Sequence, residues 1–176
     1  MMHPTSHPAA EFEVSAWLNA PGPVTLASVR GKVVALYAFQ MLCPACVTHA
    51  MPQAKELAQY FGRDELAVLG LHTVFEHHAA MNEGALAAFL HQYRIEFPVG
   101  VDRPAARGPI PTTMERYRMR GTPTLLLFDR AGVLRHSLFG YLPALQVGGL
   151  IGRLLAEPAP AGPGARKEGV HANAAD

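Results

Sequence analysis

Two cysteines separated by two residues are the clearest candidates for chemistry in this sequence. Cys43 and Cys46 are the only cysteines of the chain, and they lie where a continuous apolar run, residues 33–39, ends and a helical pattern begins. Pro44 supports a helix start here, because proline is favoured at the first helical position, where its missing N–H costs nothing. We therefore expect Cys43 at or beside the helix N-cap and Cys46 within the first turn.

This position predicts thiol–disulfide exchange. Unpaired backbone N–H groups and the positive end of the helix dipole stabilise a thiolate at a helix N-terminus, and thiols so placed are nucleophilic near neutral pH. The spacing also brings the two sulfurs close enough to form a small-loop disulfide. We expect Cys43, the outer residue, to attack a substrate disulfide and Cys46 to resolve the mixed disulfide.

The segments on either side of the pair predict the elements that hold it. Residues 33–39 lack polar alternation, which is typical of a strand covered on both faces. Residues 66–71 form a second apolar strand. Between them, one buried helical stripe is predicted by the i, i+3, i+4, i+7 spacing of Ala54, Leu57, Ala58 and Phe61. Upstream, residues 17–19 and 24–26 flank Pro21-Gly22-Pro23 and predict a short N-terminal strand pair joined by a turn.

The second half of the chain predicts a closing hairpin and a final helix. The predicted elements are a helix capped by Asn82, an extended piece at 97–101, a surface loop at 103–113, a hairpin of 125–128 with 133–139, and a helix carrying Val147, Leu150, Ile151 and Leu154. Strands and helices alternate before the antiparallel hairpin. The fold class is therefore α/β, a three-layer sandwich of a mixed central sheet with an N-terminal strand pair and helices on both faces.

Length and composition fit one domain with two flexible ends. A chain of 176 residues, about half of them apolar, can bury a sizeable core. We place the domain at residues 14–157, with a flexible N-terminus at 1–13 and a flexible Pro/Ala/Gly-rich tail at 158–176. The formal charge of +1 gives no electrostatic reason to expect nucleic acid or a membrane surface as the main partner, and no apolar run is long enough to span a bilayer.

The N-terminus carries neither a basic region nor an apolar core of the kind that marks a secretory signal. The sequence as it stands therefore predicts a cytoplasmic protein, or a periplasmic one if a leader has been removed. In the cytoplasm an exposed cysteine pair is more often catalytic or metal-binding than structural.

The motif Cys43-Pro44-Ala45-Cys46 in a strand-to-helix turn resembles the thioredoxin superfamily. Gly121-Thr122-Pro123-Thr124, just before an apolar strand, looks like that superfamily's cis-proline loop. Together with the N-terminal segment and the insertion before Phe97-Pro98, the chain resembles the TlpA/ResA-like, or redoxin, thiol-disulfide oxidoreductases from about Trp17 to Glu157. Two motifs on matching elements, roughly eighty residues apart, are strong support.

The resemblance implies a site and its partners. Pro123 would be cis, with Thr122 against the attacking sulfur, and Leu42, Pro44 and Ala45 would line the substrate site. The substrates would be disulfides of proteins or small molecules, and a separate thiol system would supply electrons. Neither a metal nor an organic cofactor is required.

Three positions depart from the family pattern. Leu42 replaces the usual tryptophan before the first cysteine, and Tyr37 stands where thioredoxins carry a buried aspartate and TlpA-like proteins often an asparagine. His49 occupies the place of a glutamate three residues after Cys46. In a regular helix His49 would lie over the turn that holds Cys46, so we expect it to carry the proton that Cys46 exchanges.

Three alternatives remain open on the sequence. A structural zinc site would need ligands beyond the two cysteines, drawn from His49, His72, His77 or His78. A peroxiredoxin-like thiol peroxidase would need a threonine three residues before its cysteine, where this chain has Gln40, and a proline four before that, where it has Leu36. A non-enzymatic redox sensor would use the same cysteine pair without turnover.

Two groups of charged residues have no settled role on the sequence. His72, His77 and His78 cluster after the second apolar strand, on what reads as a solvated loop, although ligands often bind at such strand ends. Arg116, Arg118 and Arg120 alternate before the expected cis-proline loop. If that stretch is extended, they share one side, where they would lower the pKa of a nearby thiol or attract an acidic partner.

Overall fold

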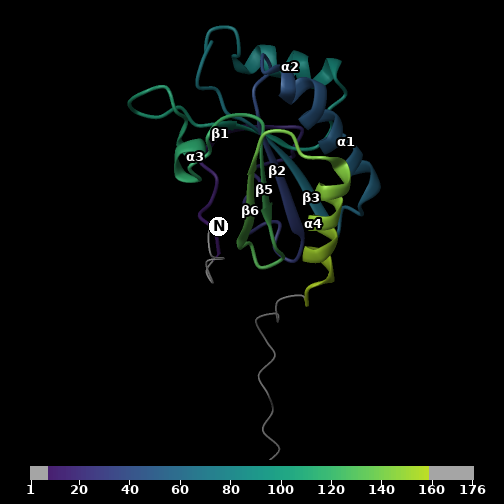
Figure 1. Ribbon diagram of the computed structural model, residues 1–176. Helices are drawn as coiled ribbons and strands as arrows, with labels where there is room; N and C mark the ends of the chain where they lie inside the picture. Colours follow the sequence, from purple (N-terminus) through teal and green to yellow (C-terminus); the bar gives the residue numbers. More distant parts are fainter. Residues whose placement is uncertain (1–7, 159–176) are drawn as a thin grey trace, which may run out of the picture.

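The computed structural model describes residues 8–158 and is shown in Figure 1. Of the ends predicted to be flexible, 1–13 and 158–176, residues 1–7 and 159–176 lie outside the described residues. The elements in chain order are β1 Val14–Leu18, β2 Val33–Phe39, η1 Cys46–Ala50, α1 Met51–Tyr60, β3 Leu66–His72, α2 Glu83–Gln92, β4 Val99–Asp102, α3 Thr112–Arg116, β5 Thr124–Phe128, β6 Leu134–Phe139 and α4 Ala144–Ala156.

The strands form one mixed sheet in the order β1-β4-β3-β2-β5-β6. β2, β3 and β4 are parallel, whereas β1 on β4, β5 on β2 and β6 on β5 are antiparallel. β2 lies inside the sheet, and every one of its residues is buried, as its unbroken apolar run predicts. The predicted mixed-sheet α/β sandwich is confirmed. Because β2 is an inner strand, its carboxyl end, after which the cysteines follow, lies centrally among the strand ends on one side of the sheet (Figure 1).

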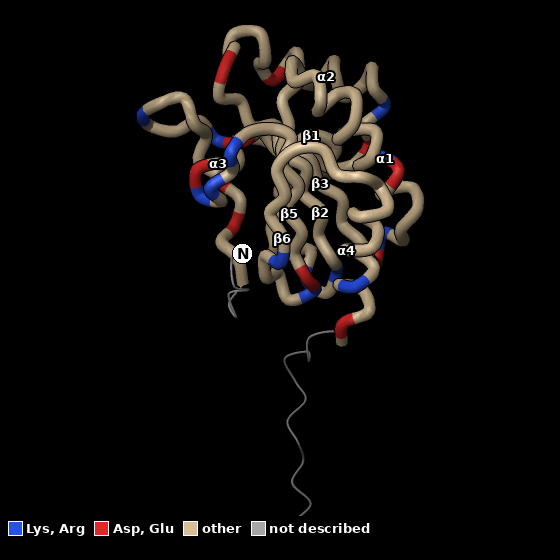
Figure 2. Tube along the Cα trace, in the orientation of Figure 1, with Lys and Arg blue, Asp and Glu red and all other residues tan. Residues whose placement is uncertain are grey.

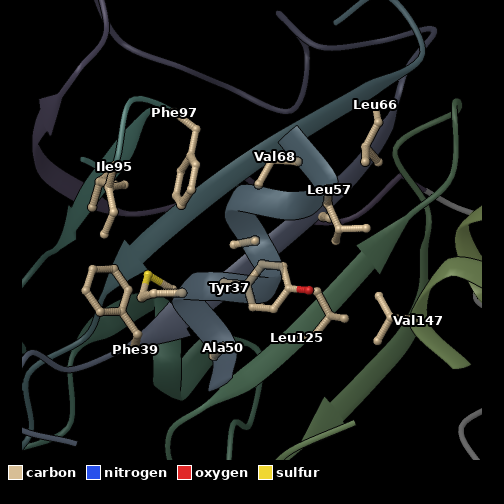
Figure 3. Close-up of a cluster of buried hydrophobic side chains, with 14 of the residues drawn as sticks. Tyr37, Phe39, Ala50, Leu57, Leu66, Val68, Ile95, Phe97, Leu125 and Val147 are labelled. Carbon is tan, nitrogen blue, oxygen red and sulfur yellow. The ribbon is translucent and has the colours of Figure 1, made fainter. Parts of the chain in front are cut away.

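Each face of the sheet has its own apolar cluster. On one face, side chains of β2 such as Tyr37 and Phe39 pack with Leu57 of α1, Leu125 of β5 and Val147 of α4 (Figure 3). Helix α2 adds Leu86 and Leu90 to this cluster. The other face is covered by the short α3, through Met114, and by Phe12 and Leu26 from the segments around β1. Helices therefore lie on both faces, with the longer ones on the face that carries the cysteines.

The N-terminal strands pair differently from the expected local hairpin. β1 pairs with β4, with Trp17 opposite Gly100, and residues 24–26 form no strand. The prolines of Pro21-Gly22-Pro23 supply no N–H for a hairpin ladder, while β4 offers β1 an open sheet edge. Leu26 is nevertheless buried, and its N–H donates to the Glu11 carboxylate at 2.7 Å.

The segment before β1 packs against the domain over its described part. Phe12 is 9% exposed and its ring lies 5.8 Å from that of Phe128. Ala9 donates its N–H to the carbonyl of Gly132 at 2.8 Å. Within the described residues the ordered packing thus begins before residue 14, and the limits 14–157 stay a prediction. None of the helices over residues 8–158 is long and apolar enough to cross a membrane.

Candidate active site at the carboxyl end of β2

Cys43 lies at the turn between β2 and the helix that follows. Its N–H donates to the carbonyl of Gln40 at 3.2 Å, which closes the turn, and its own carbonyl accepts the N–H of Val47 at 3.1 Å. Helical geometry begins at Pro44, as the sequence predicts. The Sγ of Cys43 accepts the N–H of Cys46 at 3.3 Å, as a capping side chain accepts from the third helical residue. The sulfur therefore takes one of the free N–H groups of the helix end.

The helical turn that begins at Cys46 is wider than an α-helical turn. Residues Cys46–Ala50 form a π-helical segment, in which the N–H of Met51 bonds to the carbonyl of Cys46 five residues back. Pro52, which follows immediately, has no N–H to donate. Such π turns recur at functional sites because they re-aim side chains. Here the wider turn rotates His49 away from the position that a regular helix would give it relative to Cys46.

The two sulfurs have opposite environments. Cys43 is partly exposed, whereas Cys46 is fully buried, and both are free thiols. Burial, and then the hydrogen bond with Cys43, raise the pKa of Cys46 to about 12, although hydrogen bonds from the Gln40 backbone and the Thr122 side chain favour its thiolate. Desolvation is the dominant cause, because a charged sulfur loses most of its hydration in this position. Cys46 is therefore a protonated thiol at neutral pH.

A cis peptide bond faces the cysteines from a distant part of the chain. Thr122–Pro123 is cis, as the resemblance implied. The Cys43 thiol donates to the carbonyl of Thr122 at 3.6 Å. The loop is held on both sides, since Gly140 donates its N–H to the carbonyl of Pro123 at 2.8 Å and the Thr124 hydroxyl donates to the carbonyl of Gly121 at 2.7 Å. Two motifs far apart in sequence thus form one site.

Exposed apolar side chains surround Cys43. Leu42 is 57% exposed, and Pro44 is exposed beside it, while Ala45 is half-buried. Two further aromatic residues that the sequence did not point to, Phe139 and Tyr141, are 50% and 59% exposed. Phe139 lies against Gly121 of the cis-proline loop, and Tyr141 lies against His49. The hairpin register contained a signal for Phe139, because the last residue of β6 pairs with Thr124, directly after the cis-proline.

His49 contacts the aromatic rim. Its ring lies 4.7 Å from that of Tyr141 at an interplanar angle of 45°. No hydrogen bond joins His49 to Cys46 among the contacts of residues 8–158. The imidazole is exposed, whereas the sulfur of Cys46 is buried beneath the same turn. His49 therefore lies on the solvent side of Cys46 but outside its hydrogen-bonding shell.

Tyr37 takes part in a buried hydrogen-bond chain beneath the site. Its hydroxyl donates to Oε1 of Gln53 at 2.9 Å, and Nε2 of Gln53 donates to the carbonyl of Leu142 at 2.9 Å. Burial, with a smaller effect of Glu56, raises the pKa of Tyr37 far above its ordinary value, so the phenol stays neutral and donates. The chain ties β2 and α1 to the segment that carries Tyr141. Figure 3 shows the Tyr37 ring within the apolar cluster.

His72, His77 and His78 do not form a cluster. His72 belongs to β3 itself, is 1% exposed and lies 5.3 Å from the Phe39 ring, whereas His77 and His78 are exposed on the loop. Placing His72 on a solvated loop was wrong, because the strand runs one residue further than its apolar pattern. Its Nε2 has no hydrogen-bond partner within residues 8–158, and burial lowers the pKa of His72 to about 4.

The zinc alternative finds no ligand set in the part of the chain that the structure describes. No three His, Cys, Asp or Glu side chains there gather as they would around a metal ion. His72 is directed into the core beside Phe39, and His49 packs against Tyr141 at a tilted angle. Two sulfurs alone do not complete a tetrahedral site.

The three arginines before the cis-proline loop do not share one side. Arg116 ends α3 and pairs with Glu13 at 2.9 Å. Arg118 has φ +50°, so the stretch is a turn and not extended. Arg120 alone reaches the rim of the site, with its guanidinium carbon 5.4 Å from the centre of the Phe139 ring. The stretch forms the helix α3 and a turn in place of an extended segment, so the alternation of the three arginines in the sequence does not place them on one side.

A cysteine pair at a helix N-terminus, opposite a cis-proline on a mixed α/β sheet, defines the thioredoxin-like thiol-disulfide oxidoreductases. The chain belongs to the AhpC/TSA family, whose model matches residues 5–137. This confirms the resemblance to the redoxin branch of the thioredoxin superfamily.

Solved structures share the whole described fold. The crystal structure of a thioredoxin-like superfamily protein, SPOA0173, is 53% identical, with a TM-score of 0.85 over 88% of this chain and 100% of that chain. A thiol-disulfide isomerase from Corynebacterium glutamicum is 42% identical, with a TM-score of 0.84 over 87% of this chain and 99% of that one. At these sequence identities, the two structures resemble this chain in sequence as well as in fold.

Curated relatives are much longer than this chain. The protein DipZ of Mycobacterium tuberculosis is 33% identical over 129 residues, which are 72% of this chain and 17% of DipZ. The NHL repeat-containing protein 2 of Gallus gallus is 32% identical over 126 residues, which are 70% of this chain and 16% of that protein. The chain therefore spans about a sixth of the length of the curated relatives that it matches.

Proposed function

We propose that the protein exchanges a dithiol for a disulfide at Cys43 and Cys46, with protein or small-molecule disulfides as substrates. The observation that carries this proposal is the position of the Cys43 sulfur. It lies between the N–H of Cys46, at 3.3 Å, and the carbonyl of Thr122, at 3.6 Å. The sulfur is partly exposed, next to helix N–H groups that stabilise a thiolate and beside the backbone along which a substrate would lie.

The exchange proceeds in two steps. The Cys43 thiolate attacks one sulfur of the substrate disulfide, forms a mixed disulfide with it and releases the other sulfur as a thiolate. Cys46 then loses its proton and attacks the Cys43 sulfur, which releases the second substrate thiol and leaves a Cys43–Cys46 disulfide. Two electrons pass from the protein to the substrate, and a separate thiol donor restores the dithiol. In the opposite direction the same steps oxidise a substrate dithiol.

The surrounding residues have supporting roles in this proposal. Thr122 and Pro123 present the substrate backbone to Cys43, and Leu42, Pro44 and Ala45 form the apolar surface around the attacking sulfur. His49 passes the proton of Cys46 to and from solvent, which its exposed position beside Tyr141 favours. The thiol form of Cys46, with its pKa of about 12, makes removal of that proton part of the resolving step.

The location of the protein, cytoplasmic or, if a leader has been removed, periplasmic, stays a prediction.

The peroxidase alternative receives less support from the site. Gln40, at the position where a peroxiredoxin would have threonine, is 2% exposed. Its Oε1 accepts the N–H of Phe75 at 3.3 Å and its Nε2 donates to Glu76 at 3.4 Å. Both ends of its side chain are therefore engaged with the loop after β3, and neither is offered to a peroxide at Cys43.

Insulin reduction by single-cysteine variants tests the proposal. Cys43→Ser should lower turnover by at least about 10³-fold, because the nucleophile is lost. Cys46→Ser should also stop turnover, but it should accumulate a covalent complex with the substrate that a reductant dissolves. Peptide mass spectrometry should locate that bond at Cys43. A complex through Cys46 in the Cys43→Ser variant, or undiminished insulin reduction by both variants, would contradict the assignment.

A further inference from the structure

Arg120 and Phe139 form a cationic shelf beside the cis-proline loop. The guanidinium carbon of Arg120 lies 5.4 Å from the centre of the Phe139 ring, within the range of a cation–π contact. Phe139 is half-exposed at the end of β6, and Arg120 is exposed. The two side chains thus place a positive charge on an apolar surface that solvent reaches.

This shelf adjoins the backbone that contacts the nucleophile. Arg120 is two residues before Thr122, whose carbonyl accepts the Cys43 thiol. Phe139 pairs with Thr124, directly after the cis-proline. A Cβ built on Gly121 would lie 3.0 Å from the Phe139 ring, so the ring packs closely on the loop itself. Any chain that extends along the cis-proline loop from Cys43 therefore passes near the shelf.

Arg120 differs from the neighbouring arginines in its partners. Arg103 and Arg116 both pair with Glu13, at 2.7 and 2.9 Å. Arg120 has no carboxylate within ion-pair distance among residues 8–158, and its contact is the Phe139 ring. Figure 2 shows residues of both signs around α3, where these pairs lie. The charge of Arg120 is thus left available to a partner that comes to the site.

We propose that Arg120 and Phe139 select disulfide substrates with an acidic residue near the reacting cysteine in an extended protein segment. A carboxylate of the substrate contacts the guanidinium, and an apolar neighbour packs on the ring. The proposal rests on the exchange activity proposed above and names its substrate class. The rim supplies the complementary apolar surface through Leu42 and Tyr141.

Two sets of three matched peptides test this selection. Each carries one cysteine as a mixed disulfide with neutral 2-thiopyridine, and each has Glu, Gln or Lys at the same place, two residues before the cysteine in one set and two after it in a second. Release of 2-thiopyridone is followed by absorbance. In one of the two sets we expect the second-order rate constant for reaction of the pre-reduced protein with the Glu peptide to exceed that with the Gln peptide by roughly two- to fivefold, as for an exposed ion pair, with the Lys peptide slowest.

Two variants separate a local contact from net charge. Arg120→Gln should reduce the Glu-to-Gln ratio to about one. Arg118→Gln removes the same charge from an exposed residue two positions away and should leave the ratio unchanged. The preference of the wild type should shrink as salt rises, because an exposed pair is screened over about 8–10 Å at physiological ionic strength.

The outcomes separate the selection from the activity. Release from the three peptides at equal rates would overturn the selection while leaving the exchange activity in place. An equal loss of preference in Arg118→Gln would overturn it too, because net charge would then explain the effect. Absence of release from every peptide would overturn both the selection and the exchange activity.

Discussion

The exposed part of the site around Cys43, here called the rim, differs in composition and burial from the part around Cys46, here called the floor. The rim around Cys43 consists of exposed apolar and aromatic side chains on loops and strand ends, with Leu42, Phe139 and Tyr141 as its largest members. The floor around Cys46 is a closed part of the core, where Tyr37 and His72 are also buried. The two sulfurs, three residues apart, lie on either side of this boundary.

This difference supports the roles proposed above for the two thiols. A partly exposed sulfur next to a helix N–H can meet a substrate, whereas a fully buried one can meet only its neighbour. Burial also favours the protonated form of Cys46, because desolvation raises the pKa of its thiol. In the proposed exchange, attack on the substrate would therefore occur at the exposed Cys43, and the resolving step would require removal of a proton from the buried Cys46. Three predictions, on His72, Tyr37 and His49, test this division.

The largest effect is expected for the buried histidine of the floor. The pKa of His72 is lowered by burial from 6.5 to about 4, so the folded state binds fewer protons than the unfolded state between these values. Its contribution is complete above pH 6.5 and is lost as the pH falls towards 4. Each unit of pKa difference is worth about 1.4 kcal/mol, so this loss amounts to roughly 3 kcal/mol.

Replacement of His72 by leucine should remove this pH dependence. Urea unfolding at pH 7 and pH 4.5 measures the free energy of unfolding of each protein. His72→Leu should lose clearly less stability across that interval than the wild type. His78→Leu, on the exposed loop, is the matched control and should behave like the wild type. Equal acid sensitivity of all three proteins would show that His72 is not held neutral.

A smaller effect is expected for the hydrogen-bond chain beneath the site. Tyr37→Phe removes the hydroxyl and leaves Oε1 of Gln53 buried without its 2.9 Å donor. The free energy of unfolding should fall by about 1–2 kcal/mol. Tyr60→Phe removes a hydroxyl from a residue that is 83% exposed and should change it by less than about 0.5 kcal/mol.

The double variant sharpens this prediction. Gln53→Met in the Tyr37→Phe background removes the stranded acceptor and should recover part of the lost stability. A Tyr37→Phe protein as stable as the Tyr60→Phe control would contradict the chain as a structural tie between β2, α1 and the segment at Leu142. Chemical denaturation at pH 7 measures all of these differences.

The smallest effect is expected at the rim, where His49 faces solvent. His49→Gln should slow resolution of the mixed disulfide at most roughly tenfold, below the about 10²-fold of a fixed general acid or base, because water also exchanges the proton. His49→Phe keeps an aromatic ring against Tyr141 but cannot carry a proton.

Single-turnover kinetics between pH 5.5 and 8.5 separate these two roles of His49. Similar slowing and the same change of pH profile in both variants would support proton transfer. Slowing in His49→Gln alone would show that the contact with Tyr141 matters, and no change in either variant would end the proposed role of His49.

Local sequence signals predicted where several helices begin and where one hairpin turns. Pro44 marked the helix start, Asn82 caps α2 by accepting the N–H of Ala85 at 3.0 Å, and Asp129-Arg130-Ala131-Gly132 joins β5 to β6 as a hairpin. These signals work because capping, proline geometry and turn formation involve neighbours in sequence. The cis peptide before Pro123 came from the family resemblance and not from local rules.

Other features depended on contacts between distant segments. β1 pairs with β4 instead of residues 24–26, because a sheet edge competes with a poor local partner. The helix α3 places Arg116 on Glu13 and leaves Arg120 on Phe139. No periodicity marked His72 as buried or Tyr141 as the neighbour of His49, since each position is decided by elements that meet only in the folded chain.

The sequence by itself determined that a cysteine pair begins a helix at the end of a buried strand, because residue types along one short stretch decide it. Only the tertiary structure decided which sulfur meets solvent and which lies in the core, and what surrounds each of them. The wide turn at Cys46–Ala50, the loop at Pro123 and the end of β6 converge there from three parts of the chain. Burial and hydrogen bonding at that meeting point arise from packing, which no single segment encodes.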